Sequence, residues 1–484
     1  MSAKPNLKPV KYINDPVYGG IPVTELELKI IETPVFQRLR GLRQLAKVNY
    51  VFPGAEHSRF VHSLGVMYIM GLMTEHLLKN NEIQEMDAIK MRVAALVHDI
   101  GHYPLSHLGE SVYGYCKDNE YAENYLQLSN EEKTSSPLFF VSASHSKAAD
   151  HEHLGKYIVE NNDRLNGIIK EYGLDPEEIG SIFTGEIGSR NMVYSQLLHS
   201  SLDADRLDYL LRDSYQTGVK YGLVDLQYLI RLLMIVDNPE QGGKVLVCNK
   251  KGQHVVEHFL MSRYFHYSQV VFHKTNASFE GMIKGMYVEL LQKGKFMYNS
   301  LDEIRKNVND DSFMNFNDSA LDTALYNYYR EPACSQEFKK LYEMYRDRIR
   351  PKVVFEIKDL YEENPSVDFT ALKWHLKKNP DKITEILGTD MWGYQIVPIT
   401  IEKIHGHYSI TEAIKDHEEE LRDAVKVYDP DTKKISYLAE DKLSIINKLA
   451  NYKSEFIRIY MLSDKNSSSD FKIIYDKINE LIKS

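Results

Sequence analysis

The chain has few cysteines and no excess of basic residues. Its 484 residues include three cysteines, Cys116, Cys248 and Cys334, which are odd in number and widely spaced. This pattern excludes a disulfide framework and a thiolate metal site. The formal net charge is −10 and the pI is about 6.0, whereas a generic nucleic-acid binder is usually basic. Nucleic acid is therefore not an expected partner, although local basic pockets for phosphates remain open.

The chain also lacks long hydrophobic runs. Its first residues, MSAKPNLKPVKYINDP, have no apolar core of the kind found in signal peptides, and no stretch is apolar for long enough to cross a bilayer. We therefore expect a cytoplasmic protein that does not contact membranes. The length permits one large domain or two to three smaller ones.

The most informative stretch is AALVHDIGHYPLSHLGE, residues 94–110. An apolar helical run leads into the adjacent pair His98 and Asp99, and His102 and His107 follow within two turns. A neighbouring imidazole and carboxylate offer a nitrogen and an oxygen donor that can reach one ion. On a continuing helix His102 would share the face of His98, but a glycine and a proline interrupt the pattern. A lone His-Asp pair is common by chance, so this stretch needs support from elsewhere.

The periodicity predicts a mainly α-helical chain with short hairpins and a smaller C-terminal α/β part. Turn residues between short apolar stretches predict a hairpin over residues 11–25. Helices are predicted over residues 26–45 with an interruption at Pro34, over 58–78, from His151, over 195–220, over 256–291, and onward to about residue 380. Strands are predicted with a turn over residues 49–60, as a hairpin over 244–256 with KKG at its turn, and over 424–438 and 455–462 with a helix between them. Residues 117–145 are expected to form a long irregular excursion, KNSSSD a loop, and the C-terminus an amphipathic helix.

Four side chains from three segments can be combined into one metal site: His62, His98, Asp99 and Asp205. Two imidazoles and two carboxylates favour a first-row divalent ion such as Mn²⁺, Fe²⁺, Co²⁺ or Zn²⁺. Water bound to such an ion becomes a nucleophile near neutral pH, and the ion polarises a phosphoryl oxygen. The alternative is that each residue is a structural hydrogen-bonding group, because spacing does not show that the segments converge.

Three long motifs carry a family resemblance. They are RLRGLRQLAKVNYVFPGAEHSRFVHSLGV, LVHDIGHYPLSH and LDADRLDYLLRDSYQTGV, in this order. Together they closely resemble the HD-domain deoxynucleoside triphosphate triphosphohydrolases, which include the vertebrate SAM-and-HD-domain dNTPase and bacterial dNTPases. The match runs from about Asp15 to Met286 and thins towards the C-terminus. The resemblance implies an N-terminal hairpin and effector-site helix (1–50), an HD phosphohydrolase core (51–300) and a C-terminal helical and small-sheet region (301–484) packed on that core.

The resemblance also implies roles for individual residues. The family's metal-ligand positions carry His62, His98, Asp99 and Asp205, which implies one tight divalent metal (Mn, Fe, Co, Zn or Mg), with additional Mg²⁺ accompanying the nucleotide. The catalytic positions carry His102, His107, Glu110, His151 and Glu152. The triphosphate positions carry Arg59, Arg206 and Arg263, whose guanidinium forks suit phosphate oxygens. The deoxyribose positions, including those for the 3′-hydroxyl, carry Gln44, Tyr209 and Asp213. From the residues alone, Asp213 can instead pair with Arg212 on a helix, and Tyr209 can be a core aromatic.

The implied reaction is attack of water on the α-phosphorus of a dNTP, which releases the deoxynucleoside and intact triphosphate. Glu32, Gln37 and Arg40 fall on the family's nucleotide effector positions, although a basic stripe there can also be a solvated helix face. The family therefore implies a nucleotide-regulated homo-oligomer, a dimer or tetramer, that acts in dNTP pool control or in antiviral or phage defence.

Three features depart from the family pattern. Val271 replaces the tyrosine that relatives commonly place beneath the sugar, Glu32 replaces an aspartate, and the 117–145 excursion is longer than in the vertebrate relative. Two alternatives therefore stay open: hydrolysis of other nucleotides (monophosphates, cyclic dinucleotides or alarmones), and a nucleotide-sensing binding module without turnover. Intact catalytic positions count against the second, and three arginines favour a triphosphate over a monophosphate.

Overall fold

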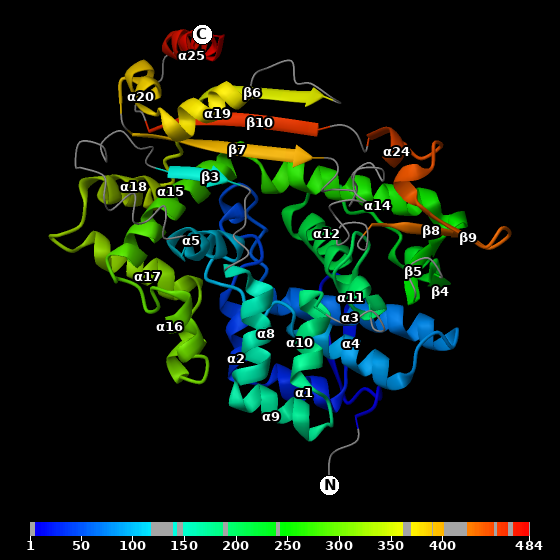
Figure 1. Ribbon diagram of the computed structural model, residues 1–484. Helices are drawn as coiled ribbons and strands as arrows, with labels where there is room; N and C mark the ends of the chain where they lie inside the picture. The colour runs from blue at the N-terminus through cyan, green and yellow to red at the C-terminus, as the bar shows by residue number, and fades with distance from the viewer. Residues whose placement is uncertain are drawn as a thin grey trace.

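The structure is a computed structural model that describes residues 5–117, 139–142, 149–186, 192–238, 243–361, 369–389, 391–400, 424–449, 453–462 and 468–483. It is mainly α-helical, as predicted, with a smaller C-terminal part that contains strands (Figure 1). None of the described helices combines the length and hydrophobicity that crossing a membrane requires.

The N-terminal hairpin forms as predicted. Strand β1 (Lys11–Asp15) pairs antiparallel with β2 (Gly19–Val23). Helix α1 (Glu25–Ile31) follows, and its N-terminus is closed by a reciprocal capping box. The predicted interruption at Pro34 is confirmed because Pro34 is the first residue of α2 (Pro34–Gln37), where its missing N–H costs no helical hydrogen bond. A 3₁₀ turn, η1 (Arg38–Gly41), continues the chain.

Helix α3 (Arg59–Lys79) is the centre of the helical core. It is apolar around most of its circumference, which is typical of a helix enclosed by others. It packs against α4 (Glu85–Val97) and α12 (Ala204–Thr217). The helices around these three are α5 (His107–Lys117), α8 (His151–Asn161), α9 (Asp163–Glu171), α10 (Pro176–Thr184), α11 (Met192–Leu198), α13 (Leu226–Arg231), α14 (Gln253–His266), α15 (Lys274–Gln292), α16 (Leu301–Lys306), α17 (Asp318–Tyr329) and α18 (Gln336–Arg346).

Three local predictions are wrong. Residues 49–60 form no strand, because a 3₁₀ turn (Val48–Tyr50) and further turns leave a single β-bridge between Arg43 and Ser58. The predicted hairpin over 244–256 is absent, since β5 (Gly243–Asn249) pairs with the preceding strand β4 (Leu233–Asn238), and KKG instead forms a turn into α14. The predicted helix over 256–291 is broken: α14 continues into a π-helical turn, η6 (Tyr267–Val271), and α15 starts afresh with His273 as its N-cap.

The C-terminal part is built on a four-stranded sheet with the order β3-β7-β10-β6. Its strands are β3 (Phe139–Ser142), β6 (Lys352–Tyr361), β7 (Trp392–Thr400) and β10 (Lys453–Met461). Helices α19 (Phe369–Lys378), α20 (Asp381–Leu387) and α25 (Ser468–Lys483) lie on its outer face, and α14 and α15 lie beneath it (Figure 1). Strand β6 interrupts the helices expected to continue to residue 380, whereas the predicted strand at 455–462 and the terminal helix are confirmed.

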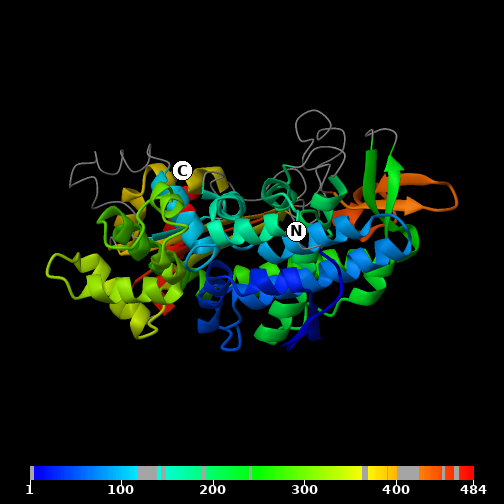
Figure 2. The same ribbon diagram turned by 90° about the horizontal axis from the view of Figure 1, so that it is seen from below.

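A second sheet has the order β4-β5-β8-β9, so strands from both halves of the chain share it. Strands β8 (Lys426–Asp429) and β9 (Lys434–Tyr437) form the hairpin predicted within 424–438, and helix α24 (Ile445–Leu449) separates them from β10. Seen from below, this sheet and α16–α18 lie at opposite ends of the molecule (Figure 2). The C-terminal part is thus joined to the helical core through two sheets.

The chain between α5 and α8 contributes strand β3, which pairs parallel with β7. Most of the 117–145 excursion lies outside the described residues. Residues 465–467 of the KNSSSD tract also lie outside them, whereas residues 468–470, predicted to be in a loop, begin helix α25. Through β3, the segment that connects α5 to α8 is therefore part of the C-terminal sheet.

Candidate active site and metal centre

Three helices bring the four predicted metal ligands together. His62 lies on the buried central helix α3, Asp205 lies in the first turn of α12, and α4 ends at Val97, so that His98 is its C-cap and Asp99 follows. His62 Nε2 is 2.9 Å from Asp205 Oδ1 and 3.5 Å from Asp99 Oδ2. His98 Nε2 is 3.3 Å from Asp99 Oδ1 and 3.7 Å from Asp205 Oδ1. The ligand atoms of His62, His98 and Asp99 therefore lie within 4.8 Å of one another, and Asp205 is close to both imidazoles of this group.

The hydrogen bonds behind these imidazoles fix which ring nitrogen is available. His62 donates from Nδ1 to Asp208 Oδ2 at 2.7 Å, and His98 donates from Nδ1 to the Ala95 carbonyl at 2.8 Å. In neutral rings Nε2 then carries the lone pair, as in metal-binding histidines whose outer N–H is held by an acceptor. Both Nε2 atoms are buried and make no well-formed hydrogen bond within the described part of the chain. These buried atoms and the mixed nitrogen-oxygen donor set fit a divalent ion.

The charges around His62 favour a bound cation. Burial lowers the pKa of His62, but the nearby carboxylates of Asp205 and Asp208 outweigh burial and raise that pKa to about 10. The Asp99 carboxyl is also buried, yet Arg59 and His98 keep its pKa well below the usual value. Negative charge that would hold a proton on His62 can hold a metal ion in its place.

Asp208 is a functional residue to which the sequence reasoning gave no role. Besides His62, it accepts from Arg212 Nε at 2.8 Å and from the Tyr18 hydroxyl at 2.7 Å. Arg212 is fully buried and also donates to Asp15 Oδ2 at 2.7 Å. The alternative in which Arg212 pairs with Asp213 is therefore wrong, because the guanidinium lies against the carboxylate four residues earlier. The i, i+4 spacing of this pair was the available signal.

A second cluster lies beside the first. It contains His102, His107, Glu110 and His151, whose ligand atoms all lie within 4.8 Å of one another. Glu110 Oε2 accepts from Nδ1 of His107 and from Nδ1 of His151, both at 3.1 Å. The His102 and His151 rings stack with centroids 3.8 Å apart. His102 Nε2 is 3.1 Å from Asp99 Oδ1, so the two clusters are contiguous.

This second cluster contains groups in opposite protonation states. Burial alone would lower the pKa of His151, but the Glu110 carboxylate raises it to about 10. Burial opposes ionisation of Glu110, yet His151 and His107 lower the Glu110 pKa strongly. Burial and the Arg59 charge keep the pKa of His102 well below 6.5, so this ring stays neutral. At neutral pH the cluster thus offers a cationic imidazole beside a carboxylate.

Glu152 and the three arginines have partners of their own. Glu152 Oε1 lies 3.3 Å from His199 Nδ1, next to the cluster of His151. Arg59 donates to Asp99 Oδ2 at 2.8 Å and to Ser106 Oγ at 3.0 Å. Arg206 folds back onto the side chain of Asp203 and the carbonyl of Ser200. Arg263 is buried near the ring of Tyr267.

The predicted sugar-binding residues lie on neighbouring elements. Gln44 is buried, and its backbone N–H donates to the His57 carbonyl at 3.0 Å. Asp213 is buried on α12 and contacts two histidines, His57 and His266. Tyr209 is half-buried and packs against the hydrophobic core, and its ring also lies against His266 with centroids 5.2 Å apart.

The predicted effector residues lie on the segment that follows α1. Glu32 and Arg40 are exposed, and Arg40 Nε donates to Gln37 Oε1 at 2.7 Å while its guanidinium covers the Phe60 ring. The intervening Arg38, which the sequence reasoning treated as part of a basic stripe, points the other way. It is buried and donates to the carbonyls of Ile100, His102 and Phe316. No local pattern in the sequence distinguishes these two arginines.

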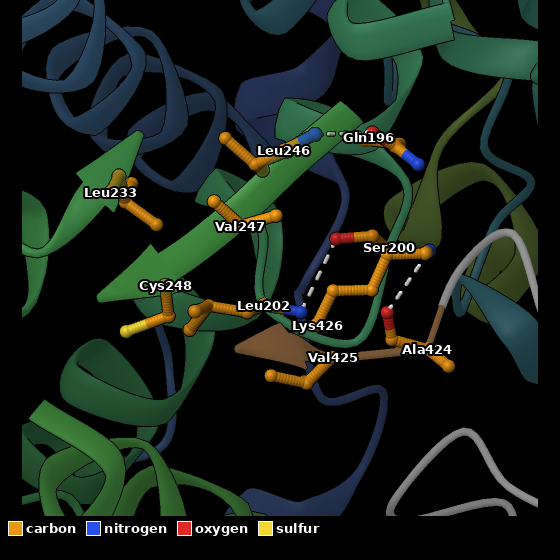
Figure 3. Close-up of a pocket in the computed structure, with 10 residues that line it drawn as sticks. All are labelled: Gln196, Ser200, Leu202, Leu233, Leu246, Val247, Cys248, Ala424, Val425 and Lys426. Atoms are coloured by element: carbon orange, nitrogen blue, oxygen red, sulfur yellow. Dashed lines mark hydrogen bonds between the residues drawn. The ribbon is translucent and has the colours of Figure 1, made fainter. Parts of the chain in front are cut away.

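One small pocket can be excluded as a substrate site because of its size. It lies between α11, β5 and β8, and the residues that line it include Ser200, Cys248 and Lys426 (Figure 3). Its volume is about 20 Å³. That is space for one or two water molecules.

Comparison with known proteins identifies the domain. Residues 59–213 match the HD domain. The chain is 32% identical to the uncharacterized protein YwfO of Bacillus subtilis, over 57% of this chain and 56% of that protein. It is 30% identical to human deoxynucleoside triphosphate triphosphohydrolase SAMHD1 over 47% of this chain and 37% of that protein, and 30% identical to the Dictyostelium discoideum SAMHD1 homologue over 58% and 50%. The chain spans about half the length of the curated relatives it matches.

Solved structures support the same fold. A phosphohydrolase from Bacteroides thetaiotaomicron is 24% identical with a TM-score of 0.62, over 93% of this chain and 100% of that one. A hypothetical protein from Aquifex aeolicus is 22% identical with a TM-score of 0.66, over 97% of this chain and 99% of that one. At these identities the structures support the fold alone. The sequence comparisons go further: the chain contains an HD domain over residues 59–213 and is similar to the SAMHD1-like triphosphohydrolases at about 30% identity.

Proposed function

We propose that this protein is a metal-dependent dNTP triphosphohydrolase that releases the deoxynucleoside and inorganic triphosphate. The observation that carries the proposal is the contact between two clusters: Asp99 belongs to the group of proposed metal ligands with His62 and His98, and Asp99 Oδ1 lies 3.1 Å from His102 in the cluster of His107, Glu110 and His151. A metal-binding group and a proton-transfer group thus adjoin, as hydrolysis of a phosphate ester requires.

The proposed metal ligands are His62, His98, Asp99 and Asp205. A bound divalent ion would lower the pKa of its water and polarise a phosphoryl oxygen. Their donor set suits Mn²⁺, Fe²⁺, Co²⁺, Zn²⁺ or Mg²⁺, and the nucleotide would bring further Mg²⁺ of its own.

Glu110 orients the two proposed proton donors. It accepts from Nδ1 of both His107 and His151, so neither contact with Glu110 uses the Nε2 atom of the ring. The His107 side chain is 53% exposed and that of His151 is 14% exposed. We assign His107 as the accessible general acid that protonates the leaving 5′-oxygen, and His151 as the cation that stabilises charge on the α-phosphoryl group. Glu152 supports His151 from the same helix turn.

The proposed triphosphate ligands are Arg59, Arg206 and Arg263. Arg206 has an internal partner in Asp203, so binding requires it to exchange that carboxylate for a phosphate. Gln44, Tyr209 and Asp213 are the proposed deoxyribose contacts. The proposed effector contacts are Glu32, Gln37 and Arg40. We further propose that the protein is a nucleotide-regulated dimer or tetramer in the cytoplasm. It would serve dNTP pool control or phage defence.

The test is incubation of metal-loaded protein with each dNTP, singly and in mixtures, in ¹⁸O-labelled water. Attack at the α-phosphorus forms a bond from water oxygen to phosphorus and breaks the bond to the 5′-oxygen, so the label must appear in triphosphate and not in the deoxynucleoside. Release of pyrophosphate or phosphate would indicate a phosphohydrolase of another nucleotide class. No turnover in any mixture would indicate a sensing module.

Asp205→Ala provides the matched control for this assay. It should remove bound metal and turnover together while the helical circular dichroism is unchanged. Asp225→Ala removes another aspartate at a helix N-terminus, the N-cap of α13, and should retain both properties. Turnover in metal-free Asp205→Ala would refute the assigned role of this carboxylate.

A further inference from the structure

The Asp213 carboxylate lies between two histidines from distant parts of the chain. Oδ1 accepts from His57 Nε2 at 2.7 Å, and Oδ2 accepts from His266 Nε2 at 3.0 Å. All three side chains are at least nine-tenths buried. His57 lies in the turns before α3, Asp213 lies on α12, and His266 is the last residue of α14.

The two imidazoles keep Asp213 ionised inside the protein. An isolated buried carboxyl would take up a proton, because burial disfavours the charged form. Here burial is outweighed by hydrogen bonds from His266 and His57, and the Asp213 pKa lies below its usual value. Each carboxylate oxygen has a second lone pair, so Asp213 can still accept a hydrogen bond from a ligand.

Three acceptor atoms near Asp213 are buried without a partner. Because both histidines donate from Nε2, their Nδ1 atoms are acceptors when the rings are neutral. In the part of the chain that the structure describes, His57 Nδ1, His266 Nδ1 and Gln44 Oε1 are buried without a hydrogen-bond partner, as is the Tyr221 hydroxyl beside the His266 ring. Gln44 is joined to His57 through its backbone N–H. Buried acceptors that lack partners call for a ligand that supplies O–H groups.

The position of the His266 ring is fixed by neighbouring aromatics. Tyr209 and Tyr221 each pack against it with centroids 5.2 Å apart. The π-helical turn that follows His266 ends at Val271, where a branched aliphatic side chain offers no hydroxyl and no ring. The side-chain contacts described for the Asp213 carboxylate come from the two imidazoles.

From this geometry we infer that His57 and His266 are positioning residues that hold Asp213 as an anionic acceptor for a sugar hydroxyl, and thereby set selection for the 3′-hydroxyl of the nucleotide. The inference rests on the proposed function, since it concerns the sugar of the same substrate. It adds two residues, His57 and His266, to the determinants of sugar specificity. A site that hydrogen-bonds a hydroxyl rejects the analogue that lacks it, because its buried acceptor is then left unpaired.

The experiment compares a dNTP with the matching 2′,3′-dideoxynucleotide. kcat and KM are measured for wild type, His57→Phe and His266→Phe, which keep a ring but remove the N–H donor. We expect each variant to lose about 10- to 100-fold in kcat/KM for the dNTP, mainly through KM, while kcat/KM for the dideoxynucleotide changes less than about threefold. His266→Gln, which restores a donor, should recover part of the discrimination, and His254→Phe, on the same helix with an 89% exposed side chain, should behave as wild type.

Equal losses for both nucleotides in variants with wild-type circular dichroism would overturn the inference, and so would unchanged discrimination. His57→Phe and His266→Phe lie on different elements, so one can be read if the other fails to fold. Equilibrium dialysis without turnover gives the corresponding ratio of affinities for the dNTP and the dideoxynucleotide. If wild type hydrolyses neither nucleotide, the proposed function fails, but the dialysis ratio still tests the inference. Loss of the preference for the dNTP in the Phe variants would support the inference. The absence of any preference in wild type would refute it.

Discussion

Replacing Asp208 with asparagine should weaken metal binding although Asp208 is not one of the proposed ligands. Its carboxylate accepts from His62 Nδ1 at 2.7 Å and from two nitrogens of the buried Arg212 at 2.8 and 3.0 Å. The amide nitrogen of asparagine is a donor, so one of these donors would lose its acceptor and the His62 ring would lose its fixed tautomer. Loss of such an outer contact typically costs 10- to 100-fold in metal affinity, or about 1.4 to 2.7 kcal/mol.

The same substitution should also lower the free energy of unfolding. Breaking a buried ion pair by removing one partner costs about 3–5 kcal/mol. Asp15 still accepts from Arg212 at 2.7 Å, so we expect the lower end of that range. Asp15→Asn is the matched control, because Asp15 contacts Arg212 without contacting His62.

Two measurements separate these effects. Equilibrium dialysis with Mn²⁺ followed by metal analysis gives affinity, and urea denaturation of the metal-free protein gives the unfolding midpoint. Asp208→Asn should be impaired in both, whereas Asp15→Asn should lose stability and bind Mn²⁺ as wild type does. Wild-type Mn²⁺ affinity in Asp208→Asn would refute the reasoning, because His62 would then not depend on Asp208 for its orientation.

Three further predictions concern Gly65, Glu280 and Arg38. At Gly65 an added Cβ would lie 1.9 Å from Asp208 Oδ1, so Gly65→Ala should reduce Mn²⁺ binding. Gly167 lies on an open helix surface, so Gly167→Ala should stabilise the protein by about 0.5–1 kcal/mol in thermal unfolding. Burial raises the pKa of Glu280 from 4.5 to about 7. Between these pH values the folded state holds a proton that the unfolded state has released, so the free energy of unfolding falls as the pH rises. Glu280→Gln should therefore raise the free energy of unfolding in urea by on the order of 2 kcal/mol at pH 8 and have little effect at pH 5. An equal gain at both pH values would contradict this account. Arg38→Met leaves three main-chain carbonyls without a charged donor and should cost on the order of 3 kcal/mol, and an unchanged urea midpoint would contradict the contacts described.

Local patterns predicted the fold well where neighbouring residues decide the conformation. The helix predicted over 58–78 is observed at Arg59–Lys79, and Pro34 interrupts the chain where expected. Prediction was wrong where the partner lies elsewhere in the chain. Strand β5 was correctly read as extended, but its partner is β4 and not the residues after KKG, because pairing depends on which strand lies alongside.

The amino-acid sequence by itself determined the donor types of the site and their order: two imidazoles, two carboxylates and a second group of histidines with an acid. Only the tertiary structure decided that these segments meet, and that His62 and His98 leave Nε2 available. The same holds for Asp208, Arg38, His57 and His266, whose partners are up to 278 residues away. Residue type and helical spacing are local properties that the sequence carries directly, whereas a hydrogen bond between distant residues depends on how helices pack, and no local spacing encodes that.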